Sequence, residues 1–367
     1  MEKKKISIVG IRGIPARYGG FETLVENLAP FLVREGYKVT VYGRKKFVPK
    51  KLKWYKGVRI VKTPSFPTKH FDTVSHTIFS IPHIIFTRPK ILFVLNLINT
   101  IFCLPLKLFG IKIIINVDGL EWERKKWGYF SKKAYQISAY LATKFANEII
   151  TDARVIKNYY EKKYNKNSCF IPYGYEIQKP LGLELLENLN LQVGEYFLWV
   201  GRLEPENNPE MVIEAFKNSK TKKKLLILGD NPYKKKYVKK LRDSANERII
   251  MPGAIYGDGY SELLYNSYCF IHSSEVGGTH PALVEAMGAE KPVLLLKNEQ
   301  NYEVAGSIAL YFNDKYELKN LIEWSDKNPE GLLEIGKNLK KRAEEFYSWK
   351  NVLIEYKKLF ERFIRNA

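Results

Sequence analysis

Cysteine is scarce in this sequence. Among its 367 residues there are only three cysteines, Cys103, Cys169 and Cys269, and they lie far apart. An odd, widely spaced set provides neither a disulfide framework nor the paired spacing of a zinc site, and no Asp-x-Asp pair favours another metal. We therefore expect a metal-independent protein of a reducing compartment such as the cytosol.

Long apolar runs are also missing. The longest stretch without a charged residue, Ile91–Leu106, contains two asparagines, a threonine and Pro105. A membrane-spanning helix needs about 20 apolar residues, so we expect a buried strand followed by a core or interfacial helix. The opening residues MEKKKISIVG lack the apolar region and cleavage site of a signal peptide, and none is expected.

Acidic residues are too few to balance the basic ones. The chain has 60 Lys and Arg against 39 Asp and Glu, a net charge of +21. Such a field attracts polyanions, of which nucleic acid and an anionic lipid surface are the two evident candidates. The sequence contains neither a zinc finger nor an RNP-like strand, and a lysine-rich composition with solvated faces would explain part of the charge.

The order of apolar runs predicts two α/β halves. Short runs such as Ile6–Val9 and Tyr196–Val200 alternate with helical patterns, which is typical of parallel sheets in doubly wound domains. The proline- and glycine-containing run IPYGYEIQKP interrupts the alternation. We therefore expect a Rossmann-like domain over residues 1–174 and a second one over residues 175–345, with the ligand site in a cleft between them.

The first candidate site is the stretch GIRGIPARYGGFET, residues 10–23, between a strand and a helix. A glycine-rich turn into a helix presents backbone N–H groups and the positive end of the helix dipole, where phosphate often binds. Glycines that only make room for a tight turn would explain the same residues. The spacing is not the dinucleotide fingerprint Gly-x-Gly-x-x-Gly, so the stretch alone leaves both interpretations open.

The stretch VGRLEPENNP repeats this arrangement in the second half. Arg202 directly follows a predicted strand and would stand at its carboxyl end. The planar guanidinium suits a diphosphate, because it can bind two oxygens at once. An ion pair with Glu204 or Glu206 is the alternative.

The stretch VGGTHPALVEAMG has the same form again. Gly277 and Gly278 offer backbone N–H groups at the start of a helix, which Thr279 is expected to cap. Glu285 lies further along that helix. Its carboxylate could accept hydrogen bonds from ribose hydroxyls.

Five motifs occur in order: GxPxxYGGFET, DGLEW, IPYG, VGRLxPEN, and VGGTxPxLVEAMG followed by PV. Together they resemble retaining glycosyltransferases of the GT-B fold in family 4, and more narrowly their bacterial polysaccharide rhamnosyltransferase branch. The resemblance spans residues 6 to about 300 and implies a nucleotide-sugar donor held mainly by the second domain and an acceptor held mainly by the first. It also implies that the amphipathic helix over residues 346–367, which could by itself cap the second domain, crosses back to the first.

The resemblance carries donor-site residues over one by one. Arg202 matches the diphosphate-binding arginine and Glu285 the ribose-binding glutamate, while Gly20 matches the loop that closes on the donor phosphate. Ile255 and Tyr256 lie where family members contact the base. The implied nucleotide-sugar site comprises Gly19, Gly20, Arg202, Asn207, Ile255, Tyr256, Gly277, Gly278, Thr279, Leu283 and Glu285.

Three positions depart from the family's pattern. The lysine usual five residues after the arginine is Asn207, the first acid of the usual pair is Gly277, and the histidine of the first domain's turn is Asp118. Since the last two positions help to hold the sugar in the family, we expect a 6-deoxy sugar, L-rhamnose from dTDP-rhamnose. Another UDP- or GDP-linked hexose, or a fold that has lost catalysis, is the alternative.

The expected catalytic residues are Arg202, Asp118 and Glu285. Arg202 would stabilise the leaving diphosphate, and Asp118 would orient hydroxyls of the sugar or the acceptor. A turn-forming aspartate before Gly119 is the alternative for Asp118. Retaining chemistry of this class is thought to need no protein nucleophile, because the leaving phosphate can take the acceptor's proton.

The expected acceptor is a lipid-diphosphate-linked saccharide, with Glu22, Trp122 and Arg124 beside it. The aromatic and basic stretch over residues 122–140 suits an anionic membrane surface; a core helix with a solvated basic face is the alternative. We expect a cytoplasmic protein at the inner face of the membrane. A nucleic-acid-binding protein would use the charge but leave Glu285 and the glycines before it unexplained, so we expect no nucleic-acid partner.

Overall fold

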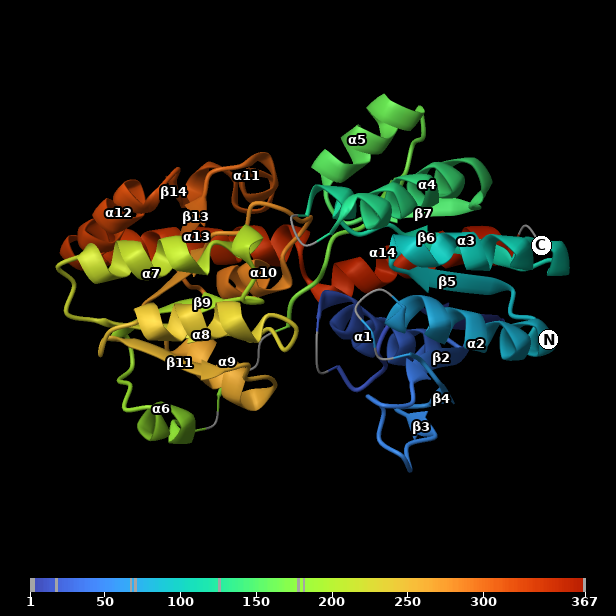
Figure 1. Ribbon diagram of the computed structural model, residues 1–367, viewed down its shortest axis with the longest axis horizontal. Helices are drawn as coiled ribbons and strands as arrows, with labels where there is room; N and C mark the ends of the chain where they lie inside the picture. The colour runs from blue at the N-terminus through green and yellow to red at the C-terminus, as the bar shows by residue number, and fades with distance from the viewer. Residues whose placement is uncertain are drawn as a thin grey trace. The chain divides into compact units, whose positions relative to one another are not determined.

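The computed structural model describes residues 4–16, 19–66, 68, 71–124, 127–176, 179–180 and 182–365. The chain divides into two compact units. Unit 1 comprises Met1–Tyr173 and Trp349–Ala367, and unit 2 comprises Gly174–Ser348. Each unit contains one mainly parallel sheet with helices on both faces (Figure 1), which confirms the predicted α/β class.

The sheet of unit 1 has the strand order β3-β4-β2-β1-β5-β6-β7-β8. Among the described strands only β3 runs antiparallel to its neighbour. All five residues of β5 are buried, as expected for a strand covered on both faces. The strands are β1 Lys5–Val9, β2 Lys38–Arg44, β3 Trp54–Tyr55, β4 Val58–Thr63, β5 Ile91–Leu95, β6 Lys112–Asn116, β7 Glu148–Thr151 and β8 Cys169–Phe170.

Alternate side chains of β5 enter two different cores of unit 1. Phe93 packs with α1 (Gly20–Arg34) and α14 (Trp349–Arg365) on one face. Leu92 and Val94 pack on the other face. The helices of that face are α2 Asp72–Thr87, α3 Thr100–Cys103, α4 Tyr129–Phe145 and α5 Arg154–Tyr164.

The last helix of the chain completes the core of unit 1. The ring of Phe93 lies 5.7 Å from that of Tyr356 and 5.6 Å from that of Phe360, and Asn116 Nδ2 donates to Tyr356 Oη at 3.3 Å. The helix predicted over residues 346–367 is α14, which begins three residues later than predicted and belongs to unit 1. Phe346 ends α13, and α14 starts at Trp349.

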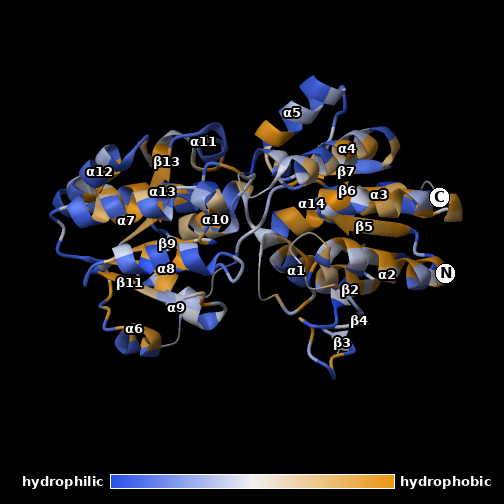
Figure 2. Cartoon of the chain, viewed as in Figure 1, coloured by the Kyte–Doolittle hydropathy of each residue, from blue (hydrophilic) through white to orange (hydrophobic). Residues whose placement is uncertain are grey.

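The sheet of unit 2 has the order β11-β10-β9-β12-β13-β14 and is parallel throughout the described strands. The strands are hydrophobic, whereas helices such as α8 and α12 are largely hydrophilic (Figure 2). The strands are β9 Tyr196–Val200, β10 Lys224–Leu228, β11 Ile249–Gly253, β12 Cys269–His272, β13 Val293–Leu296 and β14 Leu310–Phe312.

Helices cover both faces of this second sheet. One face packs against α7 Pro209–Asn218, α8 Lys235–Ser244 and α12 Lys315–Lys327. The other face packs against α6 Glu184–Asn188, α9 Asp258–Tyr265, α10 Pro281–Gly288, α11 Glu299–Ala305 and α13 Pro329–Phe346.

Among the parallel strands, the order reverses between β1 and β5 in unit 1 and between β9 and β12 in unit 2. Ligands of open parallel sheets bind beyond the carboxyl ends of the strands at such a switch point. The loops that follow these strands are therefore the first places to look for a site.

The long uncharged stretch contains a strand and short helical turns. Strand β5 is followed by η1 Leu97–Asn99, α3 and η2 Leu104–Phe109, so the expected single helix is replaced by three short segments. Across the described part of the chain, no helix combines the length and hydropathy that crossing a bilayer requires.

Candidate functional site

Two loops meet at the switch point of unit 2, residues 201–208 after β9 and residues 273–280 after β12. Trp199 Nε1 donates to Ser273 Oγ at 2.9 Å, which links the two strand ends. A Cβ on Gly229 would lie 1.9 Å from the carbonyl oxygen of Gly201. Only glycine therefore allows this close approach between β9 and its neighbour β10.

Asn207 ties the two loops together. Its Nδ2 donates to the Arg202 carbonyl at 2.8 Å, and its Oδ1 accepts from Ser274 Oγ at 2.9 Å. Its backbone carbonyl accepts from Ser273 Oγ at 2.6 Å. The sequence marked Asn207 as a missing positive charge. The structure gives its amide a bracing role beside Arg202.

Amide side chains bind the carbonyl groups of the second loop. Asn208 Nδ2 donates to the Ser273 carbonyl at 3.0 Å, and Asn298 Nδ2 donates to the Ser274 carbonyl at 2.9 Å. Within the described residues we find no hydrogen-bond acceptor for the backbone N–H groups of Gly277 and Gly278. The loop thus presents donors at the start of α10, where an anion is favoured.

Thr279 does not cap α10. The N-cap residue is His280, Pro281 is the first helical residue, and no side-chain cap hydrogen bond forms. The prediction for Thr279 was wrong because the helix begins one residue later than expected. Thr279 itself is buried.

Glu285 is held by a tyrosine that the sequence did not reveal. Tyr260 Oη, on α9, donates to Glu285 Oε2 at 2.7 Å. Burial raises the pKa of Glu285, and the hydrogen bond from Tyr260 acts in the opposite direction. Tyr260 orients the carboxylate that the sequence assigned to ribose.

The remaining candidates of unit 2 lie in different environments. The side chain of Leu283 is fully buried in the hydrophobic core. In the loop after β11, Ile255 packs against the same core, whereas Tyr256 is exposed. Of these three side chains, that of Tyr256 is the most accessible to a ligand.

In unit 1 the glycines after β1 serve close packing. A Cβ on Gly10 would lie 1.9 Å from the Leu95 carbonyl oxygen of β5, and one on Gly13 would lie 2.4 Å from Val48 Cγ2. Gly13 also has a φ of +135°. At these two positions the structure favours the tight-turn interpretation over ligand approach.

Carboxylates of α1 bind the backbone of the same loop. The Arg12 N–H donates to Glu22 Oε1 at 2.8 Å, and the Ala16 N–H donates to Glu26 Oε2 at 3.0 Å. The Arg12 carbonyl accepts from the Arg44 N–H at 2.8 Å. Gly19 precedes α1 as an extended N-cap without a side-chain cap bond, and Gly20 is the first helical residue.

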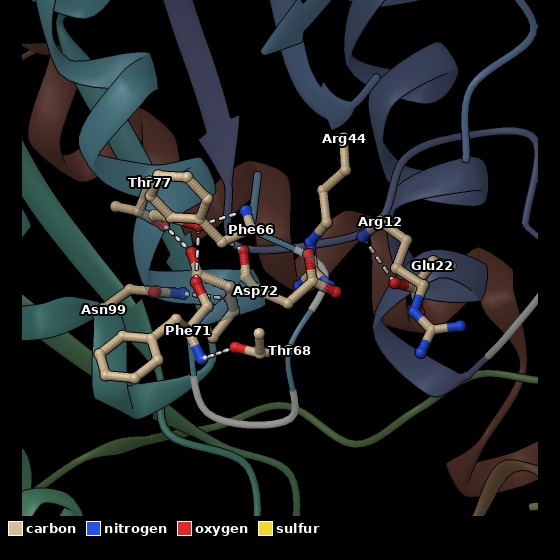
Figure 3. Close-up of polar contacts among 11 residues, drawn as sticks. Arg12, Glu22, Arg44, Phe66, Thr68, Phe71, Asp72, Thr77 and Asn99 are labelled. Atoms are coloured by element: carbon tan, nitrogen blue, oxygen red, sulfur yellow. Dashed lines mark hydrogen bonds and ion pairs between the residues drawn. The ribbon is translucent and has the colours of Figure 1, made fainter. Parts of the chain in front are cut away.

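A buried charge cluster lies beside this loop. Figure 3 shows Arg44 meeting Asp72, with Arg12 and Glu22 nearby; Arg44 Nη1 and Asp72 Oδ2 are 2.6 Å apart. Burial raises the pKa of Glu22, while its hydrogen bond from Arg12 and the charge of Arg44 lower it. No local sequence pattern indicates the Arg44–Asp72 pair, because it joins the end of β2 to the start of α2.

The other candidates of unit 1 follow β6. Asp118 has a φ of +58°, and its N–H donates to Asn116 Oδ1 at 3.0 Å. Trp122 is buried against Tyr159, and Arg124 is buried in an ion pair with Glu121 at 2.5 Å.

The expectation that Trp122 lies at a membrane interface is therefore wrong, because the indole packs into the protein core. Tyr129 and Phe130, further along the same stretch, are exposed. Residues 125–126 lie outside the described part of the chain.

Comparisons with known proteins cover nearly the whole chain. Residues 187–342 match the family described as Glycosyl transferases group 1. Residues 3–64 and 83–176 match a domain of unknown function, DUF1972. An uncharacterized glycosyltransferase of Methanocaldococcus jannaschii is 26% identical over 404 residues, which cover 99% of this chain and 100% of that protein.

Two solved structures show the same architecture. Sucrose-phosphate synthase from Thermosynechococcus elongatus superposes with a TM-score of 0.86 at 17% identity, covering 100% of both chains. Anabaena HepE, solved in complex with UDP-glucose, superposes with a TM-score of 0.79 at 16% identity, covering 98% of this chain and 99% of that one. At these identities the likeness establishes the fold.

Proposed function

We propose that this chain, whose residues 187–342 form a group 1 glycosyltransferase domain within a GT-B fold, transfers a hexose from a nucleotide sugar to a saccharide acceptor. The observation that carries the proposal is the pair of braced loops at the switch point of unit 2. They combine Arg202 with the N–H groups of Gly277 and Gly278 at the start of α10. A guanidinium and a helix N-terminus both favour the diphosphate of the donor.

The nucleoside would bind through Glu285 and the loop after β11. Glu285 accepts a hydrogen bond from Tyr260 on one carboxylate oxygen. Its other oxygen is then the proposed acceptor for ribose hydroxyls. Tyr256 is exposed beyond β11, which suits stacking on a base. The complex of HepE with UDP-glucose shows that a protein of this fold can bind a nucleotide sugar.

The proposed chemistry retains the anomeric configuration and uses no metal. The bond between the anomeric carbon and the diphosphate oxygen breaks while the acceptor hydroxyl forms a new bond on the same face. The hydroxyl proton passes to the leaving phosphate. The protein then has to position both substrates and stabilise the developing charge, for which Arg202 is the proposed main contributor. Asp118 would orient hydroxyls.

The proposed donor is dTDP-L-rhamnose. The support comes from the sequence, because Gly277 and Asp118 replace the two side chains that hold the hexose in the family that this chain resembles. A site that pairs the 6-hydroxyl would leave polar groups unpaired with a 6-deoxy sugar, and such mismatches discriminate strongly. Without those groups a methyl is tolerated.

The proposed acceptor is a lipid-diphosphate-linked saccharide at an anionic membrane surface. Support comes from the helical face of unit 1 on which α3 contacts α2, α4 and η2. Phe86 of α2, Leu108 of η2 and Phe130 of α4 are 87–89% exposed. The ammonium groups of Lys133 and Lys144 lie near the rings of Tyr129 and Tyr140. Aromatic side chains beside lysines favour an anionic interface.

Vesicle sedimentation tests the membrane part of the proposal. The protein should sediment with vesicles that contain phosphatidylglycerol and stay in solution with pure phosphatidylcholine. Replacing Phe86 and Phe130 by serine should abolish sedimentation. Leu333→Ser is the matched control, because Leu333 is exposed on unit 2. Equal sedimentation of all variants would contradict the proposed surface.

Donor binding and turnover test the central proposal. In a thermal-shift panel of UDP, dTDP, GDP and ADP, a ligand at one hundred times its dissociation constant adds about 2.7 kcal/mol of stability. We expect the largest shift with dTDP. Product formation should then be faster from dTDP-L-rhamnose than from UDP-glucose with a lipid-diphosphate saccharide. A preference for UDP-glucose would overturn the rhamnose assignment alone.

A further inference from the structure

We infer that the imidazole of His280 contacts the donor's diphosphate and, together with Arg202, stabilises it as it leaves. This inference rests on the proposed transfer from a nucleotide sugar. His280 is neither among the catalytic residues nor among the nucleotide-sugar-binding residues that the sequence predicts. It is assigned here from its place in the loop after β12.

The ring of His280 forms a wall of the glycine loop. A Cβ built on Gly277 would lie 2.5 Å from His280 Cε1 and 2.6 Å from Nε2. The ring therefore covers the position that any side chain at residue 277 would need. It lies beside the loop whose Gly277 and Gly278 N–H groups are proposed to meet the diphosphate.

A second histidine supports this ring from within the fold. His272 ends β12, is 6% exposed, and has its ring centroid 4.5 Å from that of His280. Burial lowers the pKa of His272 to about 4, so its ring is neutral at physiological pH. Its Nε2 is buried with no hydrogen-bond partner in the described structure. The ring of His280 is thus held in place between Gly277 and the ring of His272.

The two loops need a further donor beside Arg202. Residues 201–208 and 273–280 contain one arginine, no lysine and three glutamates. The family that the sequence resembles usually has a second cation at the position of Asn207. Here the Asn207 amide donates to the Arg202 carbonyl and accepts from Ser274 Oγ. A diphosphate would therefore have one cationic side chain in these loops, Arg202, while the buried carboxylates of Glu204 and Glu206 lie in the same loop as that arginine. An imidazole N–H at the start of α10 supplies an additional hydrogen bond without another fixed charge.

Calorimetric titration of the full chain tests this role. With dTDP, or whichever diphosphate of the panel binds best, His280→Ala should weaken binding about tenfold or more. With the matching monophosphate the loss should stay below about threefold, because the terminal phosphate is absent. His83→Ala is the matched control: His83 lies on α2 and pairs with Tyr42 Oη at 2.8 Å, so nucleotide affinity should not change.

The titration distinguishes a failure of the proposed function from a failure of the role inferred for His280. If the wild-type chain binds none of the four diphosphates, the proposed function and the inference both fail. If it binds one and His280→Ala binds it equally well, the inference alone fails. An equal loss for the monophosphate and the diphosphate would also overturn the assignment to the diphosphate.

Gly277→Ala provides a second test that does not depend on removing the imidazole. The new methyl group would displace the His280 ring, so it should weaken diphosphate binding in the wild-type background. In a His280→Ala background the same change should have a clearly smaller effect. Independent losses in the two backgrounds would show that the ring position does not matter, and would refute the inference.

Discussion

The loop after β1 and the loop after β12 are alike in sequence and differ in which of their backbone groups are bound by side chains. Each follows a buried strand, contains glycines and leads into a helix. After β1, N–H groups of the loop donate to the carboxylates of Glu22 and Glu26. After β12, amide side chains bind the loop's carbonyl groups instead, and the N–H groups of Gly277 and Gly278 remain for a ligand.

This difference explains why a glycine-rich turn is weak evidence for phosphate binding. In the first loop the N–H groups of Arg12 and Ala16 are already bound by carboxylates, whereas in the second loop those of Gly277 and Gly278 have no acceptor among the described residues. Both loops need glycine. At Gly10 a side chain would collide with the carbonyl of Leu95, and at Gly277 it would collide with the ring of His280. The side chains that bind the loop, more than the glycines in it, decide what the loop can hold.

The largest expected effect concerns how each unit is completed. Unit 1 depends on α14 from the end of the chain, where Phe360 is fully buried against Phe93. Phe360→Ala should lower the free energy of unfolding of unit 1 by about 3–5 kcal/mol. Denaturant unfolding measures the loss. Diphosphate affinity in unit 2 should be unchanged, and a parallel loss of affinity would contradict the separation of the two roles.

Arg202→Ala should remove transfer while leaving the fold intact. Loss of one preorganised contact to developing charge costs on the order of 3 kcal/mol, or more than a hundredfold in rate. The counterpart in unit 1 is Arg12, whose guanidinium lies 4.6 Å from the ring of Phe47. Diphosphate affinity, measured by calorimetry, should fall in Arg202→Ala and not in Arg12→Ala. Equal effects would erase the contrast between the loops.

The positions of the strands could be predicted from the sequence because their side chains form continuous apolar runs. The run Tyr196–Val200 is β9 with the same bounds, and the run Ile6–Val9 is β1 without its first residue. Helix α2 was missed because it buries Ser75, His76, Thr77 and Ser80, which hides the apolar periodicity of a core-facing helix. Buried polar residues do not produce the apolar periodicity from which a helix is predicted.

In the candidate site, too, residues in local motifs could be predicted from the sequence and their distant partners could not. Arg202 and Glu285 stand in local motifs, so one sequence was enough to select them. Tyr260 is 25 residues from the carboxylate that it orients, and Arg44 is 28 residues from Asp72. His280 gains its interest from contact with Gly277 and His272. These partners meet only through the packing of helices and strands, which local spacing does not encode.

Tyr260→Phe should weaken nucleotide binding through Glu285. The change removes the hydroxyl that donates to Glu285 Oε2 and keeps the ring. A hydrogen bond to a charged group contributes about 1.5–3 kcal/mol, and part of that should appear as lost affinity for nucleoside diphosphates. Calorimetry with pyrophosphate is the control, since it has no ribose. A similar loss for pyrophosphate would show that Tyr260 acts on the loop and not on ribose recognition.

The smallest expected effect is the pH dependence that Glu22 gives to unit 1. Burial raises the pKa of Glu22 above its usual value, so the folded state binds this proton more tightly than the unfolded state. The resulting stabilisation is present at acid pH and is lost as the pH rises through the folded pKa. Glu22→Gln cannot titrate and keeps an acceptor for the Arg12 N–H, so its overall effect should stay within about 1.5 kcal/mol. Thermal unfolding should show the variant gaining stability relative to wild type as the pH rises above 4.5, the usual pKa of a glutamate. A relative loss over that rise in pH would mean that the charged carboxylate stabilises the loop, and the contrast with the loop after β12 would then rest on geometry instead of charge.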